Sequence, residues 1–235
     1  MKKALNFIML VIIVFTTIYM EVETTPVINL PTDPKIRREV IHNGSRDTKV
    51  VYLTIDDGYP AYNLRGMIDV IEKKGVTATF FLNGEVLDYE EKLVKRIIEI
   101  GSRVGCHTYS HTPITSLTEY ELKQEIKKYE NKYYQITGIQ LERYFRPPQG
   151  VYSEKKLNIL WNMGYKVFLW DVSFYDYNPK HDLGSDFGTN AILDQICNGS
   201  IILLHTTINS NVETLEKVID SLLEQGYFFG DLKYV

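Results

Sequence analysis

The sequence contains few cysteines and no excess of positive charge. Its 235 residues include only Cys106 and Cys197, too few for a disulfide scaffold, and the sequence leaves open whether the two pair. Lys and Arg number 26 against 30 Asp and Glu, giving a formal net charge of −4. This balance argues against nucleic acid as the main partner, because no basic excess is available to neutralise phosphates. The 44% of hydrophobic residues exclude a wholly disordered chain.

Charge is also missing from a long N-terminal run. After Lys2 and Lys3, residues 4–20 contain no charged side chain and are rich in Leu, Ile, Val and Phe. A basic start followed by an apolar run is typical of a secretory signal or an N-terminal membrane anchor, so we expect residues 1–22 to direct export. No small-residue pattern ends the run, so cleaved and anchored forms both stay open. A buried N-terminal helix is the alternative.

Strands and helices are predicted to alternate from residue 48 to the end of the chain. The prolines of residues 23–47 predict an extended linker with no regular element before that point. Predicted strands span residues 49–55, 77–82, 102–106, 143–146, 165–170, 201–204 and 227–229. Predicted helices span residues 61–74, 90–100, 118–136, 153–163, 189–197 and 211–225.

This alternation indicates an α/β domain with parallel strands and helices covering the sheet. Roughly 185 residues are available, fewer than the about 250 that are typical of an eight-fold barrel. We therefore expect residues 48–235 to form a smaller, deformed parallel (β/α)7 barrel. An open, doubly wound sheet is the alternative.

Most polar residues that suit catalysis follow directly after predicted strands. These residues are Asp56, Asp57, His107, His111, Arg146, Asp171, Asp176 and His205. The strands of a parallel barrel all end at the same face, where the functional loops lie. Five segments that are far apart in the sequence should therefore meet at one site.

A metal site is predicted from Asp57, His107 and His111. Two imidazoles and a carboxylate, with open positions for water, are a typical ligand set for a catalytic divalent metal. Zinc suits this set best, although cobalt, nickel or manganese also accept nitrogen and oxygen ligands. Asp56 points away from Asp57 on an extended chain, so it can face a substrate water while Asp57 binds metal. A simple turn at Asp-Asp-Gly is the alternative.

Two further charged residues have predicted roles in the site. Arg146 precedes two prolines that stiffen the next loop, and its guanidinium can orient a carboxylate through a bidentate pair; a structural ion pair is the alternative. His205 follows an apolar strand and has Asp176 as a possible partner, which favours a general acid. Tyrosines that lie near the expected mouth and could stack on a sugar are Tyr109, Tyr152, Tyr175 and Tyr177.

Together these segments resemble the motifs of the polysaccharide deacetylase family with the NodB-homology domain, carbohydrate esterase family 4. Residues 54–58 (TIDDG) resemble the first motif and residues 107–111 (HTYSH) the second. Residues 146–150 (RPPQG), 170–177 and 203–205 (LLH) are similar to the third, fourth and fifth motifs, in family order. The resemblance covers about residues 48–232.

The resemblance implies a NodB-type barrel, a divalent metal and hydrolysis of N-acetyl groups on amino sugars. It implies Asp56 as general base, with Arg146 holding it, and His205 as general acid, tuned by Asp176. It implies Asp57, His107 and His111 as the metal ligands. On the substrate side it implies that the Gln149 backbone N–H binds the oxyanion and that Leu203 lines the acetyl pocket, and we add Tyr152 and Tyr177 as predicted sugar contacts.

Three departures from the family pattern narrow the resemblance. Ser173 replaces an Asp and Tyr177 a Trp in the fourth motif, and Gln149 replaces an aromatic residue in the third. These changes resemble the muramic-acid deacetylases that prepare muramic δ-lactam in spore cortex. That group often has Asn at the position of Asp57, so a fuller metal site is expected here.

The narrower resemblance predicts a specific substrate and setting. It implies action on N-acetylmuramic residues of peptidoglycan glycan strands by an exported, cell-wall-facing protein. We expect a monomer that meets the membrane only through its N-terminal segment. The alternatives are deacetylation of N-acetylglucosamine in peptidoglycan or another β-1,4-glycan, and a non-catalytic glycan-binding protein on the same barrel.

Overall fold

The structure, a computed structural model, describes residues 38–235. The predicted signal or anchor over residues 1–22 lies outside the described residues, as does the predicted linker up to residue 37. Within the described part of the chain, none of the helices has the length and apolar character needed to cross a bilayer.

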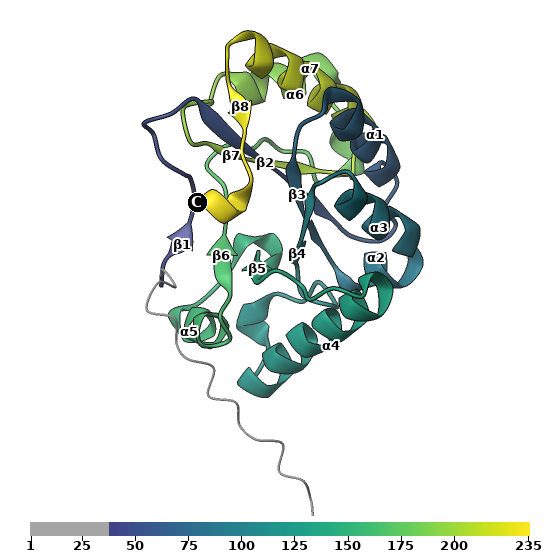
Figure 1. Cartoon of the computed structure of the whole chain (residues 1–235), viewed down its shortest axis with the longest axis vertical. Coiled ribbons are helices and arrows are strands. Elements are labelled where there is room, and N and C mark those ends of the chain that lie inside the picture. Colours follow the sequence, from purple (N-terminus) through teal and green to yellow (C-terminus); the bar gives the residue numbers. More distant parts are fainter. Residues whose placement is uncertain (1–37) are drawn as a thin grey trace, which may run out of the picture. The chain divides into compact units, whose positions relative to one another are not determined.

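Eight strands form the sheet, and every pairing between named strands is parallel (Figure 1). They are β1 (Val40–Ile41), β2 (Val50–Asp57), β3 (Ala78–Leu82), β4 (Arg103–Cys106), β5 (Tyr144–Phe145), β6 (Lys166–Phe168), β7 (Ile201–His205) and β8 (Phe228–Phe229). The strand order is β1-β6-β5-β4-β3-β2-β7, and β8 pairs with the start of β2. A parallel bridge between Val172, which follows β6, and Ile202 of β7 curls the sheet back on itself. The predicted deformed parallel barrel is thereby confirmed.

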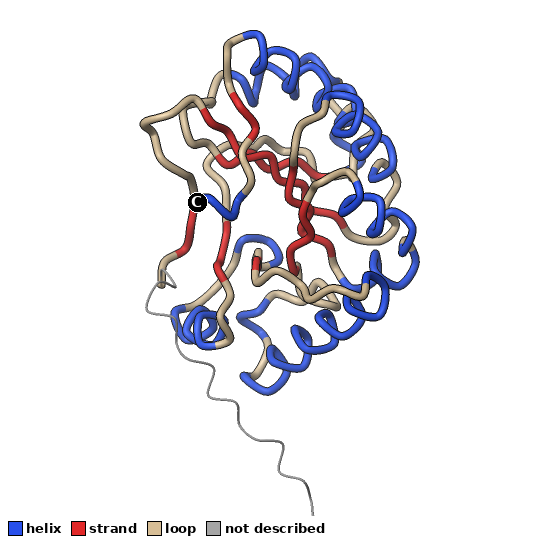
Figure 2. The backbone as a smooth tube through the Cα atoms, viewed as in Figure 1, coloured by secondary structure: helices blue, strands red, loops and turns tan. Residues whose placement is uncertain are grey.

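Among residues 38–235, seven α-helices cover the outside of the curled sheet (Figure 2). They are α1 (Leu64–Lys74), α2 (Gly84–Tyr89), α3 (Glu91–Glu99), α4 (Glu119–Thr137), α5 (Glu154–Asn162), α6 (Ser185–Leu193) and α7 (Asn211–Glu224). The longest, α4, begins at a capping box in which Thr118 and Glu121 satisfy each other's backbone N–H groups. It ends at Gly138, whose φ of 72° is a left-handed conformation that glycine adopts readily.

Three elements differ from the prediction. β1 lies inside the segment predicted to have no regular element, where Val40 and Ile41 pair with Val167 and Phe168 of β6. The short helix α2 was not predicted, because its six residues are too few to show a helical period. Helix α6 begins at Ser185, ahead of the predicted start at residue 189.

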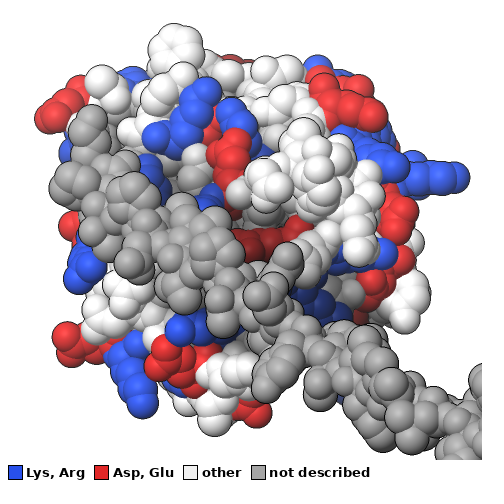
Figure 3. Space-filling view, turned by 60° about the horizontal axis from the view of Figure 1, so that its bottom comes forward, with Lys and Arg blue, Asp and Glu red and all other residues white. Residues whose placement is uncertain are grey.

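The barrel interior explains why the active residues lie where they do. All five residues of β3 and all but the first of β2 are buried, as expected for strands covered on both faces. β2 lies between β3 and β7, and Asp56 and Asp57 are the last two residues at its carboxyl end. Cys106 is buried, Cys197 is exposed and both are free thiols, so the two do not pair. On the face shown in Figure 3, Lys and Arg side chains of the described residues are interspersed with Asp and Glu.

Candidate active site

A cavity of about 810 Å³ opens at the carboxyl ends of the strands. Seven of the predicted site residues line it: Asp56, Asp57, His107, His111, Gln149, Tyr177 and His205. Arg146 and Asp176 are fully buried behind this lining. Leu203 and Tyr152 are not among the lining residues, so their predicted substrate contacts stay predictions. The predicted convergence of distant strand ends is thus present in the structure.

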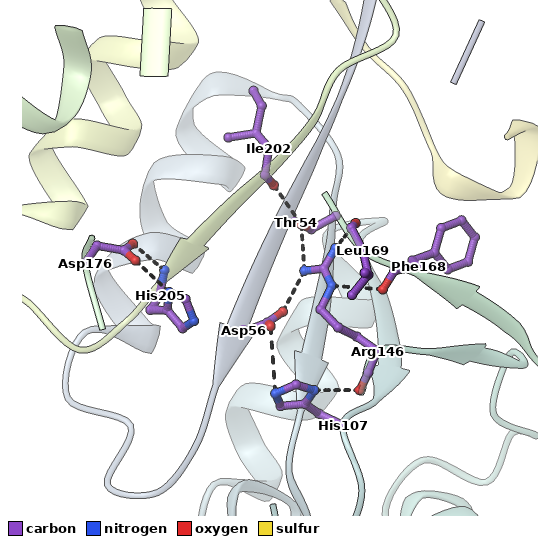
Figure 4. Close-up of polar contacts among 9 residues, drawn as sticks. All are labelled: Thr54, Asp56, His107, Arg146, Phe168, Leu169, Asp176, Ile202 and His205. Atoms are coloured by element: carbon purple, nitrogen blue, oxygen red, sulfur yellow. Dashed lines mark hydrogen bonds and ion pairs between the residues drawn. The ribbon is translucent and has the colours of Figure 1, made fainter. Parts of the chain in front are cut away.

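Asp56 is held by Arg146 beneath the cavity (Figure 4). The Nη1 atom of Arg146 donates to Asp56 Oδ1 at 2.7 Å and to Thr54 Oγ1 at 2.8 Å. The other guanidinium nitrogens donate to backbone carbonyls, Nε to Phe168 at 3.3 Å and Nη2 to Leu169 at 2.9 Å. The ion pair predicted for Arg146 is therefore present, but it is not bidentate, because the remaining donors fix the guanidinium to the backbone after β6.

This arrangement keeps Asp56 ionised. Burial by itself raises the pKa of the Asp56 carboxyl, but the charge of Arg146, the charges of His107 and His205 and the hydrogen bond from Arg146 together outweigh that effect, so the pKa lies below its ordinary value. Asp56 Oδ2 lies 3.7 Å from His107 Nε2. A carboxylate that stays charged in a buried pocket is suited to accept a proton.

His205 and Asp176 form a second pair at the same cavity. His205 Nδ1 lies 2.6 Å from Asp176 Oδ1, and the His205 backbone N–H donates to Oδ2 at 2.8 Å. Burial lowers the pKa of His205, but the hydrogen bond and charge of Asp176 raise it above its ordinary value. His205 therefore holds a proton to higher pH than a free histidine, as a general acid requires.

The register of β2 and β7 brings the two pairs together. Asp56 on β2 lies directly opposite His205 on β7. In the view of Figure 4, Asp56 lies between the His205–Asp176 pair and Arg146. The cavity thus combines a carboxylate whose pKa is lowered with an imidazole whose pKa is raised.

The two predicted imidazole ligands lie together and are neutral. His107 Nδ1 lies 2.8 Å from the Arg146 carbonyl, which can only accept, so Nδ1 carries the proton and Nε2 keeps its lone pair. The His107 and His111 rings lie 4.9 Å apart between centroids. Burial lowers the pKa of both, to about 4 for His107. Neutral imidazole is the form that binds metals.

The hydrogen bonding of the Asp57 carboxylate shows whether a metal ion suits this site. Its Oδ1 accepts a hydrogen bond from Thr206, while its buried Oδ2 has no hydrogen-bond partner. Burial raises the pKa of this carboxyl to about 7. A buried carboxylate oxygen without a partner is costly unless a cation or proton meets it. Asp57 therefore fits a divalent cation, together with the two neutral histidines.

The side chains of Asp57, His107 and His111 do not converge on a common point. Within residues 38–235, no three His, Cys, Asp or Glu side chains stand in an arrangement that would hold a metal ion as they are. Binding by Asp57, His107 and His111 therefore requires side-chain adjustment. The residue types of these three side chains, their protonation states and their shared cavity nevertheless fit a divalent metal ion.

The loop that carries both histidines is fixed by a residue not predicted from the sequence. Thr108 and His111 have positive φ values, 61° and 57°, so the segment is an irregular loop. Glu125 of α4 accepts hydrogen bonds from the backbone N–H groups of Tyr109 and Ser110 at 2.9 and 2.8 Å. These bonds hold a strained loop in one conformation.

Three other contributors were also missed. Thr206 bonds to Asp57, Thr54 bonds to Arg146, and Asn211 donates to Asp176 Oδ2 at 2.7 Å and to the His205 carbonyl at 2.8 Å. Thr206 directly follows His205, and Thr54 begins the motif of residues 54–58, so their places in the sequence were the available signals. Asp171, whose role the sequence left open, lies in a structural cluster, because it pairs with Arg46 at 2.7 Å and accepts from the Ile201 N–H.

The substrate-side predictions have mixed outcomes. Gln149 lines the cavity with a left-handed φ of 59°, between two prolines and Gly150. The Tyr177 ring lies 6.0 Å from the His205 ring. Tyr109, expected near the mouth, is instead buried, and its hydroxyl bonds to Asp88.

Comparison with known proteins gives matches over most of the chain. The family model described as polysaccharide deacetylase matches residues 43–168. The chain is 34% identical over 194 residues to the peptidoglycan-N-acetylmuramic acid deacetylase PdaA of Bacillus subtilis, covering 83% of this chain and 74% of that protein. It is 31% identical over 194 residues to a peptidoglycan-N-acetylglucosamine deacetylase of Bacillus cereus, covering 81% and 69%. The solved structure of Bacillus subtilis PdaA, a family 4 carbohydrate esterase, matches with a TM-score of 0.80 and 32% identity over 83% of this chain and 84% of that one.

Proposed function

Because the chain belongs to the polysaccharide deacetylase family, we propose that it is a metal-dependent hydrolase that removes N-acetyl groups from peptidoglycan amino sugars. One observation carries the proposal: the Asp56–Arg146 pair and the His205–Asp176 pair meet at one cavity, where the pKa of Asp56 is lowered and that of His205 is raised. Amide hydrolysis needs a base for the attacking water and an acid for the leaving amine.

The chain's own residues can perform both proton transfers. Asp56 accepts a proton from the attacking water, and Arg146 keeps it ionised and in place until then. His205 donates its Nε2 proton to the departing amine, while Asp176 bonds to Nδ1 and stabilises the imidazolium. The products are acetate and a free amino sugar. The Gln149 backbone N–H is the proposed donor to the developing oxyanion.

Asp57, His107 and His111 would hold the divalent metal. When bound, the metal supplies a Lewis acid for the acetamide carbonyl and lowers the pKa of a coordinated water. Zinc is the proposed ion, since two histidines and one carboxylate are a typical zinc set. We further propose that residues 1–22 direct export of the chain. The protein then acts outside the cytoplasm as a monomer.

N-acetylmuramic acid is the first candidate substrate. The motif resemblance and the similarity to PdaA support this assignment, and with it a role in muramic δ-lactam formation in spore cortex. A residue stripped of its peptide carries a free lactyl carboxylate, which is negatively charged at neutral pH.

The charge of the cavity favours a second candidate, N-acetylglucosamine. None of the described residues that line the cavity is Lys or Arg, whereas Glu85 lines it together with the catalytic aspartates. A free lactyl carboxylate would therefore find no Lys or Arg partner among these residues. N-acetylglucosamine is uncharged and needs no such partner.

Product analysis separates these candidates. The full-length, metal-loaded protein is incubated with peptide-free peptidoglycan strands, which are then digested to disaccharides and analysed by tandem mass spectrometry. Loss of one acetyl group from the muramic residue supports the first candidate, and loss from the glucosamine supports the second. Glycan binding without any acetyl loss, at full metal occupancy, would favour the non-catalytic alternative. Asp56→Asn should abolish the product, and the exposed Asp186→Asn serves as the matched control.

A further inference from the structure

Two tyrosines outside the predicted site stack on each other at the cavity rim. The Tyr59 and Tyr89 rings lie 4.6 Å apart between centroids, with planes tilted by 38°. Both stay open to solvent, with 46% of Tyr59 and 65% of Tyr89 exposed. Exposed aromatic rings that form a cluster mark interaction sites more often than single exposed side chains do. Here and below, the rim pair means Tyr59 and Tyr89.

The rim pair continues the catalytic cavity outward. Tyr59 lines the cavity, as does its neighbour Tyr62, which is 76% exposed, whereas Tyr89 lies beyond the lining. Tyr59 follows the end of β2 only two residues after Asp57. A ligand that leaves the cavity past Tyr59 therefore meets Tyr89 next.

Both rings are presented by constrained backbone. Tyr59 directly precedes Pro60, and the backbone of a residue before proline is sterically restricted to extended conformations. Tyr89 is the last residue of α2, and the helix is capped by Asn83, whose side chain accepts from the Val86 N–H at 3.1 Å. Contact by rigid, amphipathic tyrosines costs little conformational entropy.

A second exposed pair, Tyr175 and Tyr177, also stacks, with ring centroids 4.4 Å apart, but its member Tyr177 belongs to the predicted site. Two exposed tyrosines on α4 do not share the setting of the rim pair. Tyr120 and Tyr134 on α4 are at least half exposed, but within the described residues neither contacts another aromatic ring. Neither lines the catalytic cavity. They therefore represent ordinary surface tyrosines and provide matched controls.

We propose that the rim pair is a sugar-stacking subsite, which binds a pyranose ring of the glycan strand next to the residue being deacetylated. This inference rests on the proposed function, because the ligand is the same glycan. The C–H face of a pyranose packs on an aromatic ring, and the tyrosine hydroxyl bonds to a sugar hydroxyl at its edge. The subsite takes only strands long enough to extend beyond the cavity, so it selects for chain length.

The test compares chain lengths. KM and kcat of the full-length, metal-loaded protein are measured on a peptide-free disaccharide and on a hexasaccharide. Tyr89→Ala should raise the ratio of the hexasaccharide KM to the disaccharide KM by about threefold to tenfold. Tyr89→Phe should bring this KM ratio most of the way back to the wild-type value, and Tyr134→Ala should leave it at the wild-type value. A ratio unaltered by Tyr89→Ala would overturn the subsite.

A binding measurement keeps the inference separate from the proposed function. If the wild-type protein releases acetate but Tyr89→Ala behaves as wild type, the subsite is wrong and the function stands. If the wild-type protein releases no acetate, the function fails, and calorimetric titration with the hexasaccharide decides the subsite alone. Weaker binding by Tyr89→Ala than by Tyr134→Ala then supports it, and equal binding contradicts it. Thermal melting confirms that each variant is folded.

Discussion

Arg146 donates from Nη1 to Asp56 Oδ1 at 2.7 Å, and its guanidinium is wholly buried. No water can replace either partner there, so each side chain depends on the other for its charge. The ring of Phe81 lies 4.3 Å from the guanidinium carbon and adds a cation–π contact. The pair therefore couples the stability of the barrel to the protonation state of its catalytic base.

Removing Arg146 should damage both stability and activity. Arg146→Met leaves Asp56 as an unpaired buried charge, which costs about 3–5 kcal/mol. Urea denaturation should show this loss in the free energy of unfolding, and acetate release should fall by about 100-fold or more because the pKa of Asp56 rises. Arg143→Met is the matched control, since 44% of the Arg143 side chain is exposed and its pairing with Glu130 is worth about 1 kcal/mol or less. Equal effects of the two substitutions would contradict the assigned role of Arg146.

Asp176 should set the alkaline limit of activity. His205 must be protonated to act as the acid, and Asp176 raises its pKa above 6.5. The protein should therefore be active at pH values below the raised pKa of His205 and lose activity as the pH rises through that pKa. Asp176→Asn removes the negative charge, so the alkaline limb of the kcat profile should move to lower pH. A profile that falls in height without moving would show that Asp176 acts only structurally.

Asp57 should destabilise the metal-free protein near neutral pH. Its pKa is raised from 3.8 to about 7, so the unfolded chain releases this proton before the folded one does. In chelator, stability should therefore fall as pH rises from about 4 to about 7. Asp57→Asn carries no ionisable group at this position and should lack that part of the fall in melting temperature. Parallel melting curves for both proteins across this range would refute the effect.

Glu125 should act on metal affinity through the histidine loop. Glu125→Ala frees the N–H groups of Tyr109 and Ser110, which hold the segment between His107 and His111. Loss of such supporting bonds typically weakens metal binding by about 10- to 100-fold. Competition with a chromophoric chelator measures the change. Glu119→Ala, at an exposed helical ion pair, should leave the metal affinity unaltered.

The sequence predicted the parts of the fold that have local signals. Buried strands such as β2 and amphipathic helices such as α1 carry their pattern in consecutive residues, and the strand-end rule then placed Asp56, His107 and His205 at one face. β1 was not predicted, because two residues are too few to show the alternation of a strand. Its existence depends on pairing with β6.

The supporting contacts of the site were harder to predict for the same reason. Glu125, Asn211 and Thr206 act through hydrogen bonds to residues that only the folded chain brings near. The geometry of the Arg146–Asp56 pair is likewise decided by the carbonyls of Phe168 and Leu169, which take the other guanidinium donors.

The most direct test of the account is acetate release from peptide-free peptidoglycan strands by the full-length protein. The metal-loaded protein should release acetate in proportion to the free amines that appear on the glycan. Chelator should stop the reaction, restored metal should recover it, and Asp57→Ala should stay inactive in both states while remaining folded. Undiminished acetate release by the chelated protein, or by Asp57→Ala, would contradict the central claim that Asp57, His107 and His111 hold a metal needed for deacetylation.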